Sequence, residues 1–179
     1  GCFIIASTST NIAIYELSQQ KNEWTVALIK TMRVAVDCIC LSQEEPCFYY
    51  SKGNKILKAH LDKQKPAIAM VFKRKLIFDK DPQIKAMNMV YTVMAGEEEP
   101  DGFFAISTSE FSLIIMRIKQ GNQEILANVK NAHQMDITQI LPLTDNEDYL
   151  SFLTMSLDCA IKCFSFDGEL EFETLGEGQ

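Results

Sequence analysis

The sequence predicts an all-β protein in which one arrangement of strands recurs about four times. Segments 3–17, 47–61, 103–118 and 150–166 each contain an apolar run, a short stretch of turn-forming residues and a second apolar run. The runs are short and rich in Val, Ile, Thr and aromatic residues, which favour strands. The 179 residues, 47% apolar and 23% charged, have the composition of a folded domain.

The spacing of these four predicted hairpins indicates how they are assembled. The first apolar residues after the turns are separated by 44, 57 and 48 residues, and they are Ile12, Ile56, Leu113 and Ile161. Four-stranded units that recur roughly every 40 to 45 residues are typical of β-propeller blades, and loop insertions lengthen some intervals. The longest interval contains a Lys-rich segment, 73–83, and an acidic segment, 96–102, which account for its extra length.

Each interval also contains two further predicted strands, as a four-stranded blade requires. The candidates are 24–32, 66–74 and 124–130, followed by 34–42, 84–94 and 136–143. Helix is the competing prediction for 67–78 and 84–99, but neither has an N-cap followed by a sustained helical stripe of apolar residues. We therefore expect one propeller segment, 1–179, of about four antiparallel blades, at approximately 1–33, 34–75, 84–131 and 135–175. The first blade lacks its innermost strand, and residues 169–175 are a candidate outer strand of the last blade.

The last predicted blade resembles a WD-repeat. The resemblance is carried by Ala132-His133, "ITQILPL", "TDNED", "YLSFLTMS", Asp158 and "IKCFS" at 161–165. It implies a buried network of His133, Ser156, Asp158 and Phe164, in which Phe164 stands where the family has a tryptophan and cannot donate the indole hydrogen bond. The other blades match more loosely, so the chain resembles a divergent WD-repeat propeller protein and a fragment of a longer chain.

Charge is distributed unevenly along the chain. The formal net charge is −7 and the isoelectric point is about 4.9, yet residues 51–85 carry ten bases and only three acids. The strongest basic feature within that segment is Lys73-Arg74-Lys75, which is a candidate contact for an acidic partner. The acidic character of the whole chain argues against nucleic acid as a partner. Trp24, the only tryptophan, is a candidate anchor for a protein partner, although packing between blades would also explain it.

Catalytic, metal and cofactor chemistry find little support in the sequence. A general-base role for His133 is the alternative to the structural role implied by the resemblance, and the chain has only one other histidine. Six cysteines lie mostly in apolar runs without the spacing of a zinc site, so we expect no metal, no cofactor and a reducing compartment. No glycine-rich phosphate loop or nucleophile elbow occurs, and no apolar run is long enough for a membrane-spanning helix.

These observations favour a non-catalytic protein-protein interaction scaffold, a subunit of a larger intracellular assembly. The cytoplasm is the expected compartment, with a nuclear or a ciliary or cytoskeletal location as alternatives, and a small-molecule ligand is not expected. Partners would contact loops 73–83 and 97–101. The alternatives are a reader of a charged peptide, or a hydrolase or lyase that uses the central channel, where the predicted inner strands offer chiefly Asp37, Asn88 and Gln139.

Overall fold

The computed structural model describes residues 2–42, 46–61, 70–75, 82–92, 101–119, 122–143, 150–166 and 173–178. Within these ranges the protein has fifteen β-strands in four antiparallel sheets, one of three strands and three of four strands. The expected fold class, an all-β propeller segment with an incomplete first blade, is confirmed.

Each sheet is formed by strands that follow one another in the chain. The first sheet contains β1 (Cys2–Ser7), β2 (Asn11–Gln20) and β3 (Glu23–Arg33). The second contains β4 (Ile39–Leu41), β5 (Cys47–Lys52), β6 (Lys55–His60) and β7 (Met70–Lys75). The third contains β8 (Ile84–Thr92), β9 (Asp101–Thr108), β10 (Leu113–Lys119) and β11 (Asn122–Val129). The fourth contains β12 (Ile137–Leu143), β13 (Leu150–Ser156), β14 (Ile161–Phe166) and β15 (Glu173–Gly178).

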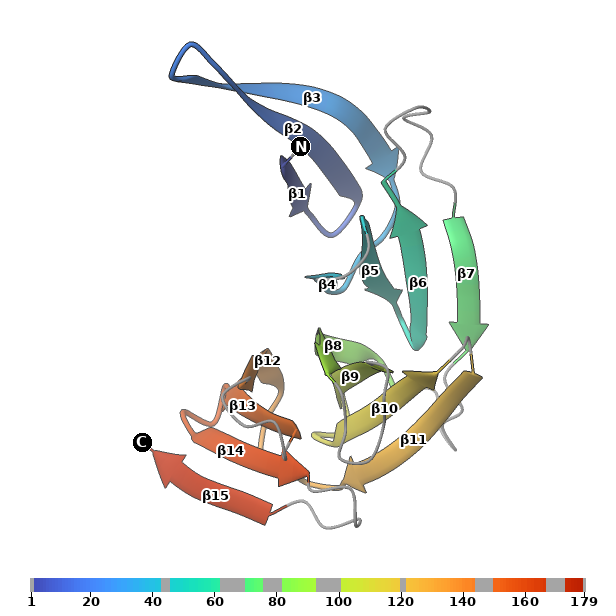
Figure 1. Cartoon of the computed structure of the whole chain (residues 1–179). Coiled ribbons are helices and arrows are strands. Elements are labelled where there is room, and N and C mark those ends of the chain that lie inside the picture. The colour runs from blue at the N-terminus through green and yellow to red at the C-terminus, as the bar shows by residue number, and fades with distance from the viewer. Residues whose placement is uncertain are drawn as a thin grey trace.

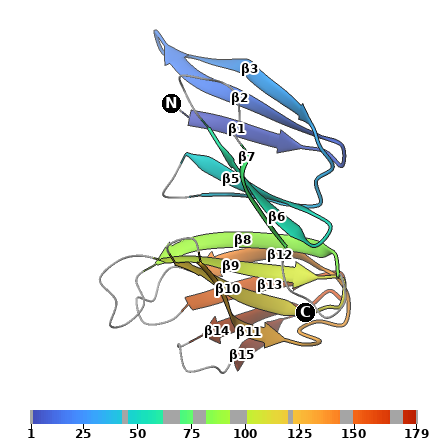
Figure 2. The ribbon, with the colours of Figure 1, turned by 90° about the vertical axis from the view of Figure 1, so that its right-hand side faces the viewer.

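The four sheets stand side by side around an arc that does not close (Figure 1). Strands β4, β8 and β12 lie toward the centre of the arc, and β3, β7, β11 and β15 lie on its outer side. Figure 2 shows the first sheet at one end of this stack. Three apolar clusters fill the spaces between successive sheets, and they include Phe48 and Tyr50, Phe104 and Met116, and Phe152 and Phe164. The core therefore lies between blades, and each inner sheet is apolar on both faces.

The first sheet has the longest hairpin among the described residues. Strands β2 and β3 join through a two-residue turn in which Lys21 (φ 47°) and Asn22 (φ 67°) are both left-handed. Such a turn matches the twist of two antiparallel strands, and asparagine adopts it readily. As a result the polar residues 18–20 and Glu23 belong to strands, and the hairpin extends beyond the end of β1.

Two predicted strands differ in extent from the observed ones. The predicted strand 34–42 is reduced to β4, because Val34 and Val36 donate their backbone N–H groups to the carbonyls of Thr10 and Ser9 while the chain crosses between sheets. The predicted outer strand at 169–175 is observed from Glu173, where β15 pairs with β14. Its first residues, 169–172, lie outside the described residues. The competing helix prediction concerned 67–78 and 84–99. Within these ranges the structure describes 70–75 and 84–92, and both are strands, β7 and β8.

Candidate functional site

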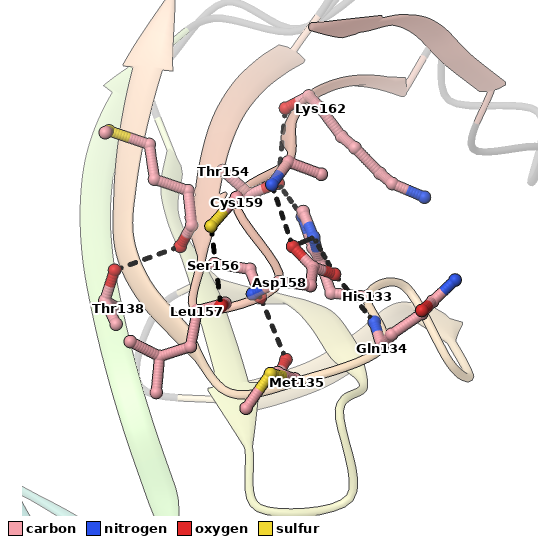
Figure 3. Close-up of polar contacts among 12 residues, drawn as sticks. His133, Gln134, Met135, Thr138, Thr154, Ser156, Leu157, Asp158, Cys159 and Lys162 are labelled. Atoms are coloured by element: carbon pink, nitrogen blue, oxygen red, sulfur yellow. Dashed lines mark hydrogen bonds and ion pairs between the residues drawn. The ribbon is translucent and has the colours of Figure 1, made fainter. Parts of the chain in front are cut away.

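The polar network of the last sheet is centred on His133 and Asp158 (Figure 3). His133 lies in the segment before β12, and Asp158 lies in the turn between β13 and β14. The Nδ1 atom of His133 is 3.1 Å from one carboxylate oxygen of Asp158 and 3.2 Å from the other. Because an ionised carboxylate only accepts hydrogen bonds, Nδ1 carries the proton in this contact.

Asp158 also holds two backbone segments in place. Its Oδ2 atom accepts the backbone N–H of Gln134 at 2.8 Å, and its Oδ1 atom accepts that of Ala160 at 3.0 Å. The second bond spans two residues, the geometry by which aspartate stabilises a turn. Cys159 completes this turn with a left-handed φ of 64°. The carboxylate thereby ties the β13–β14 turn to the segment that enters β12.

The pKa of Asp158 reflects these contacts. Burial on its own would raise the pKa, since it disfavours the charged form. Hydrogen bonds from the backbone of Gln134 and Ala160, and then interactions with Ser156 and His133, outweigh that effect and hold the pKa of Asp158 well below its usual range. The carboxylate is therefore ionised at neutral pH and acts as a permanent acceptor for its donors.

Thr154, rather than Ser156, contacts the far side of the imidazole. The Oγ1 atom of Thr154 is 2.8 Å from Nε2 of His133 and 3.2 Å from the backbone carbonyl oxygen of Lys162. Ser156 accepts the backbone N–H of Asp158 at 3.3 Å and donates to the carbonyl of Met135 at 3.1 Å, so it supports the turn. Phe164 packs against His133 with ring centroids 6.4 Å apart.

The row of carboxylate, imidazole and hydroxyl has the connectivity of a catalytic triad, but not its accessibility. The side chain of His133 is 0% exposed, and Thr154 is completely buried. A nucleophile and its base must reach a substrate to within hydrogen-bond distance. The burial of both groups favours a network that holds the blade together over a catalytic one.

The candidate contact residues lie on outer strands rather than on loops. Trp24 is 61% exposed on β3, so it does not pack between the described blades. Lys73, Arg74 and Lys75 form the end of β7, where their backbone pairs with β6, and they are not part of a loop. The rest of that predicted loop, 76–81, lies outside the described residues. The basic residues belong to the second sheet and Trp24 to the first.

The predicted acidic loop also needs correction at its last residue. Asp101 is the first residue of β9 and only 7% exposed, and its carboxylate contacts the guanidinium of Arg117 and lies 3.8 Å from Nζ of Lys119. Because Asp101 is buried and ion-paired within its own sheet, it does not present a negative charge to a partner. Residues 97–100 lie outside the described residues.

The three polar residues proposed for a channel site are separately placed. Asp37 precedes β4 and accepts the backbone N–H of Gly53 at 2.6 Å, and Asn88 donates to the carbonyl of Ile140 in the next sheet at 2.9 Å. Gln139 is exposed on β12. Two of the three thus stabilise backbone, and the described contacts do not join them into one site.

Cys38 and Cys40 lie at the inner edge of the second sheet. Burial raises the pKa of Cys38 to about 11 and also raises the pKa of Cys40, which disfavours the thiolate form of both side chains. The described part of the chain contains no group of three or more His, Cys, Asp or Glu residues arranged to hold a metal ion. In the same part of the chain, no helix is both long and apolar enough to cross a membrane.

Two solved structures resemble nearly the whole chain. The structure of Sqt1 from Saccharomyces cerevisiae matches with a TM-score of 0.59 and 15% identity, over 95% of this chain and 43% of that one. The WD40 domain of SCAP from fission yeast matches with a TM-score of 0.57 and 8% identity, over 98% of this chain and 42% of that one. No protein-family model and no curated protein matches the sequence. The likeness shows the fold: the chain has the architecture of a β-propeller segment, and it spans less than half the length of either structure.

Proposed function

We propose that this protein is a non-catalytic scaffold that binds other protein subunits within a larger intracellular assembly. The observation that carries this proposal is the contrast between buried polar groups and exposed apolar ones. The imidazole of His133, the best candidate for acid-base chemistry among the described residues, has no exposed surface. Trp24, in contrast, is 61% exposed, and tryptophan is enriched among residues that dominate protein interfaces.

The architecture supports the same proposal. Sheets that pack face to face through apolar clusters form a stiff framework, and surface segments can then vary in charge without disturbing the core. The basic end of β7 supplies Lys73, Arg74 and Lys75 as a candidate contact for an acidic partner. A protein that recognises one charged peptide would use the same residues. It would differ from a scaffold in needing only a single short ligand.

The enzyme alternative has weaker support. An open surface depression of about 400 Å³ lies beside the first sheet and is lined by Thr10, Asn11, Arg33, Val34 and Ala35. Arg33 is its one ionisable residue, and an arginine cannot exchange a proton near neutral pH. General acid-base chemistry at this depression would therefore need a group from elsewhere.

Affinity purification of the full-length protein from its native source, with chemical cross-linking and mass spectrometry, tests the proposal. We expect reproducible stoichiometric partners, with cross-links at Lys73 or Lys75. Recovery of the protein alone would contradict the scaffold proposal and would turn attention to a peptide ligand.

A charge-reversal variant then tests the contact surface. Lys73, Arg74 and Lys75 are replaced together by glutamate, and Lys21, Arg33 and Lys130, which are exposed and scattered over other parts of the surface, are replaced in a matched control. Both variants change the net charge equally. Loss of partners from the first variant alone supports the surface assignment, and retention of every partner by the first variant contradicts it.

A further inference from the structure

Three lysines occupy one row across the second sheet, at the end that carries the β5–β6 turn. Lys52 on β5 is paired with Lys55 on β6, and Lys55 is paired in turn with Lys75 on β7. Figure 1 shows the β5–β6 turn and the end of β7 at the same end of this sheet. Paired strands lie about 5 Å apart, and directly opposed residues lie on the same face of a sheet. The register therefore places three lysines side by side on one face.

A fourth lysine lies on the same face, one row further along the strands. Lys73 on β7 is paired with Leu57, which lies two residues after Lys55 and therefore on the same face of β6. Arg74 is paired with the buried Ile56, so its position lies on the opposite face. The lysine cluster defined by this register consists of Lys52, Lys55, Lys73 and Lys75.

The charges of Lys52 and Lys55 are not balanced by the described part of the protein. Lys52 is exposed and Lys55 is half-buried, and neither takes part in the ion pairs formed among the described residues. Lys58, further along β6, differs because its Nζ atom lies over the ring of Tyr49, 5.6 Å from the centroid. Like charges directly opposite each other destabilise a pair of strands. The sheet therefore contains at Lys55 a charge that costs stability, and a bound anion would offset that cost.

The turn that carries Lys52 and Lys55 is held in place from two directions. Gly53 has a left-handed φ of 62° and donates its backbone N–H to the carboxylate of Asp37 at 2.6 Å. Its carbonyl oxygen accepts the backbone N–H of Ile84, the first residue of β8, at 2.9 Å. A turn that is already fixed loses little freedom when a ligand binds, which favours affinity.

We infer that the lysine cluster binds an acidic segment of a partner protein, one in which several aspartate or glutamate side chains lie close together. This inference rests on the proposed scaffold function and deepens it, because it names a site and the chemistry of the partner. Lysine ammonium groups are point charges on flexible stems, so they select negative charge rather than the planar geometry that arginine matches. Three lysines spread over two strand spacings, about 10 Å, match several separate carboxylates better than a single phosphate group.

A substitution at the centre of the row separates this role from a structural one. Lys55→Gln removes one charge and keeps most of the side chain. Because it relieves the repulsion from its neighbours, it should raise the urea midpoint of the full-length protein. A residue that is retained for the fold would instead lower the midpoint when replaced, and that result would overturn the inference.

Binding is measured with a fluorescein-labelled octaglutamate peptide and the purified full-length protein, by fluorescence anisotropy at low salt. The test variant is Lys52→Gln/Lys55→Gln, and the control is Lys21→Gln/Arg33→Gln, which removes two exposed charges from the first sheet. We expect the test variant to bind the peptide about tenfold more weakly, and the control to stay within about twofold of the natural protein. The affinity of the natural protein should fall steeply as salt is added, because these exposed charges are screened.

Three binding results would overturn the inference. The first is the absence of peptide binding at low salt. The second is an equal loss in both variants, which would show attraction to charge in general. The third is tighter binding to vesicles of phosphatidylserine and phosphatidylcholine than to the peptide, lost in Lys52→Gln/Lys55→Gln, which would assign the cluster to a membrane surface.

Affinity purification separates failure of this inference from failure of the scaffold function. If the natural protein and Lys52→Gln/Lys55→Gln recover the same partners in equal amounts, the inference is wrong and the scaffold function stands. If the natural protein recovers no partner, the scaffold function is wrong as well. Selective loss of one partner that contains an acidic segment supports both.

Discussion

The first and fourth sheets contain the same kind of hairpin in opposite environments. In the fourth sheet, β13 is largely buried, and the turn that follows it is held by the carboxylate of Asp158, which accepts the backbone N–H groups of Gln134 and Ala160. In the first sheet, β1 is largely exposed, and the turn that follows it is held by local bonds around the hydroxyl of Thr8. The burial of a blade strand therefore depends on its inner neighbour and on the adjoining sheets more than on its own sequence.

The largest expected effect comes from placing a charge on the face of the first sheet that points away from the second sheet and includes the exposed residues Ile4, Val26 and Leu28. If a further blade covers that face, Val26→Asp in the full-length protein should lower the free energy of unfolding by about 3 kcal/mol or more, because an unpaired charge becomes buried. Urea denaturation measures the effect, and Ser18→Asp near the exposed hairpin tip is the control. If Val26→Asp lowered the free energy of unfolding no more than the control does, the result would show that no blade covers this face.

Removal of the Asp158 carboxylate should produce the next largest effect. Asp158→Ala leaves His133 and the N–H groups of Gln134 and Ala160 without an acceptor, which should cost about 1 to 3 kcal/mol of unfolding free energy. Asp37→Ala, which removes an acceptor from one backbone group, is the comparison and should cost less. Denaturant midpoints of the two variants give the ranking, and equal midpoints would contradict a special role for the Asp158 network.

A smaller effect is expected at the other side of the imidazole. Thr154→Val keeps the shape of the side chain but removes the hydroxyl at 2.8 Å from Nε2, so it should cost about 1 kcal/mol. Thr154→Ser restores the hydroxyl and should recover most of the loss. If the valine variant were as stable as the natural protein, the contact with His133 would contribute nothing to the fold.

The smallest expected effect is the loss, in acid, of the contribution that Asp158 makes to the stability of the fold. Because the folded-state pKa of Asp158 lies below its unfolded value of about 3.9, its contribution is fully present above that value and is lost as pH falls below it. The difference in stability between the natural protein and Asp158→Asn should be constant near neutral pH and shrink in acid. A difference that grows in acid would have the wrong sign for a lowered pKa. Thermal melting at several pH values measures it.

The sequence predicts the hairpins well, because alternating apolar runs and turn residues are local signals. It does not predict the length of β4, since Val34 and Val36 have an apolar pattern but their N–H groups bond to a neighbouring loop. Thr154 and Ser156 both lie on β13. Which of the two hydroxyls contacts the imidazole of His133 depends on how the segment after His133 runs along that strand. The exposure of Trp24 depends on which sheet covers β3, which no local pattern reveals.

The most direct test of the account is hydrogen exchange of the full-length protein, read on peptides that cover β1 and β13. In an antiparallel edge strand, alternate backbone N–H groups point away from the only partner and exchange rapidly. If a further strand of the full-length polypeptide pairs with the inner edge of β1, we expect β1 to be protected as strongly as β13. Rapid exchange of about half of the β1 amides, with β13 fully protected, would contradict it.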